Sequence, residues 1–399
     1  MCGIVAAVAD RNIIPVLLEG LRKLEYRGYD SAGLAFIDAS GLQRLRSVGR
    51  VAELAAQAED SQAAGDTGIA HTRWATHGVP CERNAHPHIS AGLAVVHNGI
   101  IENHESLRGQ LRALGYVFTS DTDTEVVAHL IAHELTTTVD LLSAVRQAIA
   151  QLQGAYAIAV LRESEPERLV VAREGAPLLL GLGSDGCYAA SDASALVQVT
   201  RRMVYLENGD CAELMRDRYR ITRVDGTPVE RPESESQLSA EAIELGNYRH
   251  YMQKEIFEQP VAVANTLEML GTARSLQPGI FGAESESTLG EVGQVLIIAC
   301  GTSYHAGLVA RYWLESIAGI PCSVEVASEY RYRDSVPDPR TLVVTISQSG
   351  ETADTLAALQ HAKSLGMRRT LCICNVPESS LVRENTLRFI TRAGPEIGV

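Results

Sequence analysis

The chain has 399 residues, a formal net charge of −14 and a hydrophobic fraction of 46% with only 5% aromatics. This length favours two domains, or three small ones, and the many small apolar residues are typical of soluble α/β proteins. The negative charge argues against a general binder of nucleic acid or of membrane surfaces, because both need a basic face. We therefore expect small polar substrates.

The cysteines and the start of the chain indicate the compartment. Eight cysteines are scattered without a CxxC pair, which is typical of reduced thiols and not of a disulfide framework or a zinc site. The apolar stretch from Met1 to Ala9 is short, lacks a basic leader and meets Asp10 and Arg11. It is therefore neither a signal peptide nor a membrane span, and we expect a cytoplasmic protein.

Residues 2–214 are predicted to form a first domain of layered sheets, either α+β or an α/β sandwich. Short apolar runs bounded by Gly, Asp and Asn predict strands at 92–97, 155–161, 169–172 and 187–190. Amphipathic stretches predict helices at 15–24 and 124–135.

Three other patterns suggest sites that we do not adopt. GLGSDG (181–186) matches a dinucleotide motif but has no helix after it, so we interpret it as a hairpin loop. His129 and His133 lie one helical turn apart without a third metal ligand, and we expect a solvated helix face. Cys372 and Cys374 share one strand face and are predicted to be packed thiols. The sequence thus predicts no metal and no cofactor.

The domain boundary is predicted within 225–247, where prolines, acids and serines replace large apolar residues, and we assign 215–247 as a linker. A helical segment is expected at 248–271. Strands and helices then alternate: strands at 294–299, 323–326, 341–346 and 370–374, and helices at 304–317 and 352–365. This alternation predicts a parallel sheet covered on both faces, with ligands at the carboxyl ends of its strands.

One residue at the start of the chain can supply both a nucleophile and its base. Removal of Met1, which the small side chain of Cys2 permits, leaves a thiol and a free α-amino group on the same residue. Their reference pKa values are about 8.5 and about 7.7 to 8.0, so the amine can accept the thiol proton near neutral pH. A lone cysteine in an apolar first strand is more often a buried structural residue.

Five motifs follow Cys2 in a fixed order: RGYDSAG (27–33), HTRWATHG (71–78), NAHPH (84–88), HNGIIEN (97–103) and SDTDTE (120–125). Over residues 2–214 this set resembles the glutamine amidotransferase domain with an amino-terminal nucleophile. The resemblance implies a catalytic Cys2 with Asn98 and Gly99 as oxyanion donors. It also implies that Arg73 and Asp123 hold the α-carboxylate and α-ammonium of glutamine, that Thr76 and His77 shape the pocket, and that Trp74 separates it from a path for ammonia.

The chemistry of these residues is reasonable without the family, although each has a plainer interpretation. Attack by the Cys2 sulfur on an amide builds negative charge on oxygen, which the Asn98 amide and the Gly99 N–H could stabilise. An Asn-Gly pair alone, however, favours a hairpin turn. Arg73 and Asp123 could form a surface ion pair, and Trp74 could be a core aromatic.

Two strand ends in the second half suit a phosphate. SQSGET (347–352) follows one apolar strand and precedes a helix, where hydroxyls and backbone N–H groups can surround an anion. A simple helix N-cap is the alternative. CGTSY (300–304) stands in the same position after the preceding apolar strand. Neither loop has the lysine of a nucleotide triphosphate site.

Both loops resemble the sugar isomerase (SIS) domain, a flavodoxin-like or Rossmann-like fold assigned to 290–399. The resemblance implies a sugar-phosphate site formed by Thr302, Ser303, Ser347, Gln348, Ser349 and Thr352. HYMQKEI (250–256) resembles the helix that opens the isomerase part, 248–399, of glutamine:fructose-6-phosphate aminotransferases. An amidophosphoribosyltransferase shares the front domain but should show a phosphoribosyltransferase motif, which we do not find.

The family resemblance implies an enzyme that uses L-glutamine and fructose 6-phosphate to make glucosamine 6-phosphate and glutamate, with a homodimer for full-length members. Family members continue into a second SIS half and a carboxyl-terminal tail, so we expect a truncated chain in which glutaminase chemistry survives and the synthase step is lost or feeble. A phosphosugar-binding protein without catalysis and a stand-alone glutaminase are the alternatives.

Overall fold

The computed structural model describes residues 2–25, 28, 30–74, 78–236, 245–268, 278–394 and 396–398. The chain forms two compact units, residues 1–241 and 242–399. Within the described ranges, no helix combines the length and the apolar character that crossing a membrane requires.

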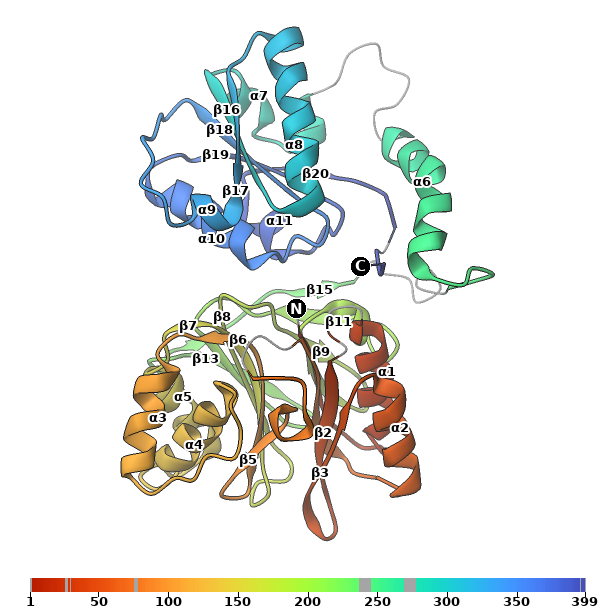
Figure 1. The fold of residues 1–399 in the computed structure, drawn as a ribbon, viewed down its shortest axis with the longest axis vertical. Helices are drawn as coiled ribbons and strands as arrows, with labels where there is room; N and C mark the ends of the chain where they lie inside the picture. Colours follow the sequence, from red (N-terminus) through yellow and green to blue (C-terminus); the bar gives the residue numbers. More distant parts are fainter. Residues whose placement is uncertain are drawn as a thin grey trace. The chain divides into compact units, whose positions relative to one another are not determined.

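The first unit contains two antiparallel sheets (Figure 1). The eight-stranded sheet has the order β15-β11-β9-β10-β1-β4-β2-β3 and the seven-stranded sheet the order β14-β13-β12-β8-β7-β6-β5. Strands of the larger sheet are β1 (Gly3–Ala9), β2 (Ser31–Asp38), β3 (Gly41–Val48), β4 (Thr67–Arg73), β9 (Leu179–Leu182), β10 (Gly186–Ala190), β11 (Arg202–Tyr205) and β15 (Glu233–Glu235). Those of the smaller sheet are β5 (His88–Ser90), β6 (Leu93–Ile101), β7 (Gly154–Arg162), β8 (Leu169–Glu174), β12 (Asp210–Leu214), β13 (Tyr219–Arg223) and β14 (Pro228–Val229).

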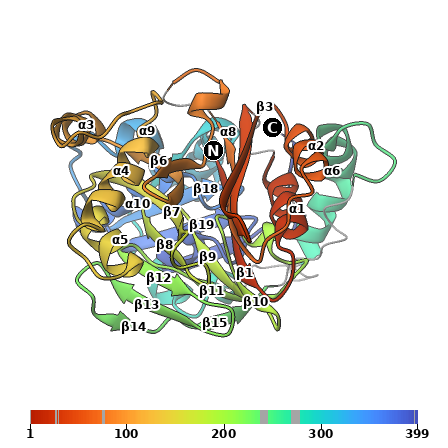
Figure 2. The same ribbon diagram turned by 90° about the horizontal axis from the view of Figure 1, so that it is seen from below.

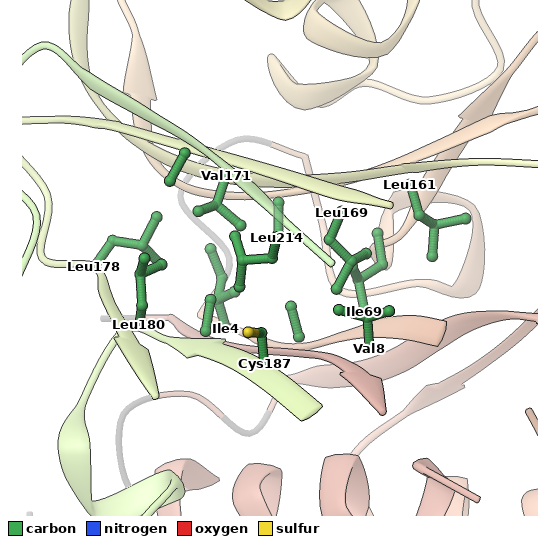
Figure 3. Packing of buried hydrophobic residues seen from close by; sticks show 14 of the residues in the cluster. Ile4, Val8, Ile69, Leu161, Leu169, Val171, Leu178, Leu180, Cys187 and Leu214 are labelled. Carbon is green, nitrogen blue, oxygen red and sulfur yellow. The ribbon is translucent and has the colours of Figure 1, made fainter. Parts of the chain in front are cut away.

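Helices cover the outer face of each sheet, so the unit has four layers. α1 (Ile14–Leu24) and α2 (Val51–Asp60) pack on the larger sheet, and α3 (His104–Ala113), α4 (Thr124–Glu134) and α5 (Leu141–Ile149) pack on the smaller one (Figure 2). The inner faces of the two sheets meet in a buried hydrophobic core (Figure 3). The expected layered sandwich is therefore confirmed.

Strand β1 is covered on both faces, which explains its continuous apolar sequence. On β1, Ile4 and Val8 face the other sheet, whereas Val5 and Ala7 face α1. Every residue of the strand is buried because both of its faces are covered. Small side chains on one of these faces allow α1 to approach closely.

The carboxyl-terminal part of this unit corrects the predicted linker at 215–247. Strand β13 pairs with β12, β14 with β13, and β15 with β11. β14 and β15 are the outermost strands of their sheets. An edge strand tolerates proline and charged residues, since one side of it makes no ladder hydrogen bonds. The polar composition that suggested a linker reflects this edge position. Residues 237–244 lie outside the described ranges.

The second unit contains a five-stranded parallel sheet in the order β17-β16-β18-β19-β20. Its strands are β16 (Gln294–Ala299), β17 (Cys322–Val326), β18 (Thr341–Ser347), β19 (Arg369–Cys374) and β20 (Leu387–Ile390). Its helices are α6 (Tyr251–Glu268), α7 (Ser285–Leu289), α8 (Gly301–Trp313), α9 (Ala327–Tyr330), α10 (Ala353–Ser364) and α11 (Ser380–Glu384). This strand order is that of flavodoxin-like folds.

Both faces of the parallel sheet are covered, as predicted. α9, α10 and α11 pack on one face, and α7 and α8 pack on the other. Cys372 and Cys374 lie in the first of these cores, which confirms that they are packed thiols. The expected helix at 304–317 begins earlier, at Gly301, and continues into a π-helical turn from Leu314 to Ala318.

Candidate active site

The ends of three strands bring the predicted glutaminase residues together. β1 and β4 are antiparallel with Gly3 opposite Thr72, so Cys2 lies beside the end of β4, which is Arg73, with Trp74 next along the chain. Asn98 lies near the end of β6, and its side-chain Nδ2 donates a 3.0 Å hydrogen bond to the backbone oxygen of Cys2. The site is thus formed at the margin of the core between the two sheets.

The Cys2 sulfur is held by the backbone of Trp74. The Trp74 N–H donates to Sγ at 3.3 Å, and Sγ lies 3.6 Å from the Trp74 carbonyl oxygen. Burial raises the pKa of the Cys2 thiol above its ordinary value, and the Trp74 N–H opposes this rise. A thiol with a raised pKa needs a nearby base to become a nucleophile at neutral pH.

Asn98 and Gly99 do not form the hairpin turn that the dipeptide alone suggests. Both lie within β6 and pair with Ala157 and Tyr156 of β7. Gly99 has φ +120, and a Cβ there would lie 2.0 Å from the backbone oxygen of Ala155. Only glycine fits this distortion, which turns the strand backbone next to the side-chain amide of Asn98.

Arg73 and Asp123 are buried, with 4% and 5% of their surfaces exposed, so they are not a surface ion pair. Asp123 precedes α4, and its Oδ2 accepts a hydrogen bond from the Ile101 N–H at 2.9 Å. Arg73 Nη2 donates to the Gly78 oxygen at 3.1 Å. The two charges act on the Cys2 thiol in opposite senses, Arg73 lowering its pKa and Asp123 raising it. Two opposite buried charges beside a thiol can accommodate a zwitterionic amino acid.

The other predicted glutamine-site residues are Trp74, Thr76 and His77. Trp74 is 39% exposed, so the interpretation as a core aromatic is wrong. Thr76 and His77 lie outside the described residues.

The predicted phosphate site lies at the carboxyl ends of β16 and β18, which are neighbouring strands with Ala299 opposite Ile346. At the end of β18, Ser347 Oγ accepts a hydrogen bond from the Gly350 N–H at 3.0 Å and lies 3.3 Å from Thr352 Oγ1. Thr352 occupies the N-cap position of α10 but makes no side-chain cap hydrogen bond. The Thr352 hydroxyl instead lies beside that of Ser347 in the loop before the helix. The alternative interpretation of this motif as a simple helix N-cap is therefore not supported.

Gly350 explains how the loop closes. Its φ is +66, and a Cβ would lie 1.9 Å from Ser379 Oγ and 2.8 Å from Cys374 Sγ. After β16, Gly301 also has a positive φ, +57, and Thr302 and Ser303 form the first turn of α8. Gln348, Ser349 and Ser303 are partly exposed. Two strand ends thus present hydroxyls and a carboxamide at the point where the strand order reverses, the usual ligand position in such sheets.

Comparisons with known proteins match both compact units of the chain. Residues 71–198 match the family described as glutamine amidotransferase domain, and residues 288–399 match the SIS domain. All 399 residues align at 55% identity with the glutamine–fructose-6-phosphate aminotransferase (isomerizing) of Xylella fastidiosa, and 58% over 401 residues with that of Pseudomonas syringae pv. tomato. The chain belongs to this aminotransferase family.

The relatives are longer than this chain. The chain spans 66% of the length of each of these curated relatives. The C-terminal domain of glucosamine-fructose-6-phosphate aminotransferase from Francisella tularensis is 49% identical, with a TM-score of 0.37, and the match covers 38% of this chain and 42% of that one.

Buried residues behind the site were not singled out from the sequence. Glu125, 3% exposed, accepts hydrogen bonds from the N–H and hydroxyl groups of Thr119 and Ser120, at 2.7 to 2.8 Å. Burial opposes its ionisation, but the His129 ring, with Nε2 3.7 Å from Oε1, and the hydrogen bonds from Thr119 and Ser120 lower the pKa of Glu125 overall. This carboxylate therefore fixes the loop that leads to Asp123.

Two buried histidines, His129 and His71, differ from what the sequence predicted or were not identified from it. His129 is buried beside Phe118, with ring centroids 4.6 Å apart, and does not lie on a solvated helix face. No cluster of three or more potential metal ligands occurs within the described ranges. His71 contacts Asn98 and shares a face of β4 with Arg73, two residues away. Strand alternation could have indicated this position.

Proposed function

We propose that the protein is a glutamine-dependent amidotransferase that hydrolyses L-glutamine at Cys2 and passes the ammonia to fructose 6-phosphate, giving glucosamine 6-phosphate and glutamate. The observation that carries the proposal is the buried arrangement of Arg73, Asp123 and Asn98 around the Cys2 thiol. Relatives 55% and 58% identical along the whole chain bear the name of this activity.

Glutamine would be oriented by its charged end. The Arg73 guanidinium suits the α-carboxylate and Asp123 suits the α-ammonium group, because both ions are buried and their charges match those of the substrate. Trp74, Thr76 and His77 would complete the pocket. This arrangement directs the side-chain amide of glutamine toward the Cys2 sulfur.

The hydrolysis would proceed through a thioester. As the thiol proton passes to the free α-amino group of Cys2, the sulfur attacks the amide carbon and the oxygen becomes an oxyanion. Asn98 Nδ2 and the Gly99 N–H would stabilise that charge. The carbon–nitrogen bond then breaks, the nitrogen takes the proton and leaves as ammonia, and water hydrolyses the thioester to glutamate.

The sugar phosphate would bind in the second unit. Hydroxyls of Ser347, Ser349, Thr352, Thr302 and Ser303, with the Gln348 amide, would surround the phosphate of fructose 6-phosphate. The start of α10 favours an anion through the aligned peptide dipoles of its twelve residues.

Glutamate and glucosamine 6-phosphate release from the purified chain, with and without fructose 6-phosphate, tests the proposal. Release of glutamate that depends on Cys2 supports the first half-reaction, and glucosamine 6-phosphate formation supports the second. A chain that binds fructose 6-phosphate but never releases glutamate would be a phosphosugar-binding protein, and the proposal would fall. The names of the relatives do not favour that alternative.

Compartment and assembly are further expectations of the proposal. All eight cysteines are free thiols, as expected in the reducing cytoplasm. A homodimer is expected for the longer protein that these relatives represent, and sedimentation of that protein would test it.

A further inference from the structure

His71 is a buried side chain that the proposed reaction does not use. It lies on β4, is 1% exposed and reaches the site from within the core. Its Nε2 lies 3.0 Å from the backbone oxygen of His97 and 3.0 Å from Oδ1 of Asn98. The ring therefore contacts the proposed oxyanion donor, and not the thiol.

The surrounding carbonyl groups determine where the hydrogens lie. A backbone oxygen can only accept, so Nε2 of His71 must carry a hydrogen to bond with His97. Because that nitrogen is a donor, the Asn98 atom beside it must be the acceptor, Oδ1. At the other end of the carboxamide, Nδ2 faces the Cys2 oxygen, which again can only accept. Rotating the amide by 180° would place a donor against a donor and an acceptor against an acceptor.

The His71 ring is suited to holding a group and not to transferring protons. Burial lowers the pKa of His71 to about 3, so the ring is neutral at neutral pH and has one N–H. Its Nδ1 makes no hydrogen bond to any described residue. The ring of His86, also buried, packs against it with centroids 4.2 Å apart.

We propose that His71 is a positioning residue for glutamine hydrolysis. Its Nε2–H fixes the Asn98 carboxamide so that Nδ2 is directed toward the Cys2 end of the site, where the oxyanion forms. The inference rests on the proposed glutaminase function. Because His71 acts through Asn98, its removal should cost less than the factor of about 10² to 10³ typical for loss of an oxyanion donor.

Kinetics of paired variants test this role. His71→Leu removes the donor, and we expect kcat for glutamine hydrolysis to fall about 10- to 100-fold with KM changed less than about threefold. His71→Gln keeps an N–H near the position of Nε2 and should recover most of kcat. His133→Gln, a partly exposed histidine on α4, is the matched control. Full kcat in the leucine variant, or a glutamine variant as defective as leucine, would overturn the inference.

A double-mutant cycle with Asn98→Ala separates positioning from general damage to the core. If His71 acts through Asn98, adding His71→Leu to Asn98→Ala should lower kcat by less than about twofold. Losses that multiply fully would mean that the two residues act independently. They would contradict the inference even if both single variants are impaired.

The wild-type protein provides a test that needs no variant to fold. Nitrogen-15 NMR of the histidine rings at pH 7 should show His71 as the neutral Nε2–H tautomer, and an Nδ1–H or charged ring would overturn the inference. The two proposals fail in different ways. A wild-type chain with Met1 removed that does not hydrolyse glutamine refutes the proposed function. An active wild type whose His71 variants behave normally refutes only the positioning role.

Discussion

The two candidate sites of this chain are constructed in opposite ways. The first consists of buried charged and polar side chains, with Arg73, Asp123 and Asn98 all less than 10% exposed and each held by hydrogen bonds. The second consists of backbone turns and small hydroxyls at a sheet edge, where Thr302 is exposed and Ser349 and Thr352 are half-buried. One site fixes side chains and the other fixes a loop.

This difference corresponds to the chemistry proposed for each. Covalent attack on an amide needs charges and donors held in place before the substrate arrives, because groups fixed in advance stabilise the transition state without reorganising. Binding of a phosphate needs mainly N–H and O–H groups converging at a helix start. Substitutions should therefore affect chemistry strongly in the first site and affinity moderately in the second.

The largest effect should come from Cys2→Ala. Loss of the nucleophile should reduce glutamine hydrolysis by at least about 10⁴-fold, while the binding of fructose 6-phosphate should stay unchanged because the residues proposed to bind it belong to the other compact unit. Glutamate release and titration calorimetry measure the two. Cys81→Ala, a partly exposed cysteine, is the control. Substantial glutamine hydrolysis by the Cys2→Ala protein would contradict the assignment of Cys2 as the nucleophile.

Arg73→Gln should be next, because it removes one of the buried charges assigned to the glutamine backbone. We expect KM for glutamine to rise about 10- to 100-fold, the equivalent of a hydrogen bond to a charged group. Arg83→Gln removes an arginine whose side chain is 60% exposed and pairs with Asp121, and it should change KM less than about threefold. Equal effects of the two variants on KM would show that burial of Arg73 has no part in substrate binding.

Glu125→Gln should lower the stability of the first unit by about 2 kcal/mol, since hydrogen bonds to a buried carboxylate are weakened. The lowered pKa of Glu125 means that this contribution is present above the unfolded pKa of about 4.3 and is lost as pH falls toward the folded pKa. Denaturant unfolding should thus show a difference from wild type at pH 7 that shrinks below pH of about 4. Glu105→Gln, whose side chain is 78% exposed, should have almost no effect. A difference in stability that does not depend on pH would contradict this account of Glu125.

Gly350→Ala should have the smallest effect and should be confined to the second site. The positive φ and the short approach to Ser379 mean that a methyl group must shift the loop. We expect fructose 6-phosphate to bind about tenfold more weakly, with glutamine hydrolysis unchanged. Gly293→Ala, where the nearest atom to a Cβ is 3.4 Å away, is the control for calorimetry. Equal affinity in wild type and Gly350→Ala would mean that this loop does not shape the phosphate site.

Much of the architecture could be predicted from sequence because local patterns determine it. The parallel sheet follows from apolar strands alternating with helices, and the motif at 181–186 forms the hairpin that connects β9 and β10 as an antiparallel pair. Edge strands β14 and β15 could not be recognised, since their polar sequence differs from a linker only through pairing with distant strands.

The candidate glutaminase site also combines residues that sequence motifs identify with features that only tertiary contacts reveal. Cys2, Arg73 and Asp123 could be named because their motifs resemble those of a family. The Asn98-Gly99 dipeptide alone suggests a hairpin turn. Its position within a distorted strand becomes visible only from the pairing with β7 and the positive φ of Gly99. His71 belongs to the motif at 71–78, but the positioning role proposed for it depends on a hydrogen bond to Asn98, 27 positions away.

The most direct test of the central claim is to trap the nucleophile. The purified chain would be treated with an electrophilic glutamine analogue, with excess glutamine as competitor, and its peptides analysed by mass spectrometry. Our account predicts one adduct, on a peptide that begins at Cys2 without Met1, and protection by glutamine. An active chain that keeps Met1, or an adduct on any of the other cysteines in place of Cys2, would contradict it.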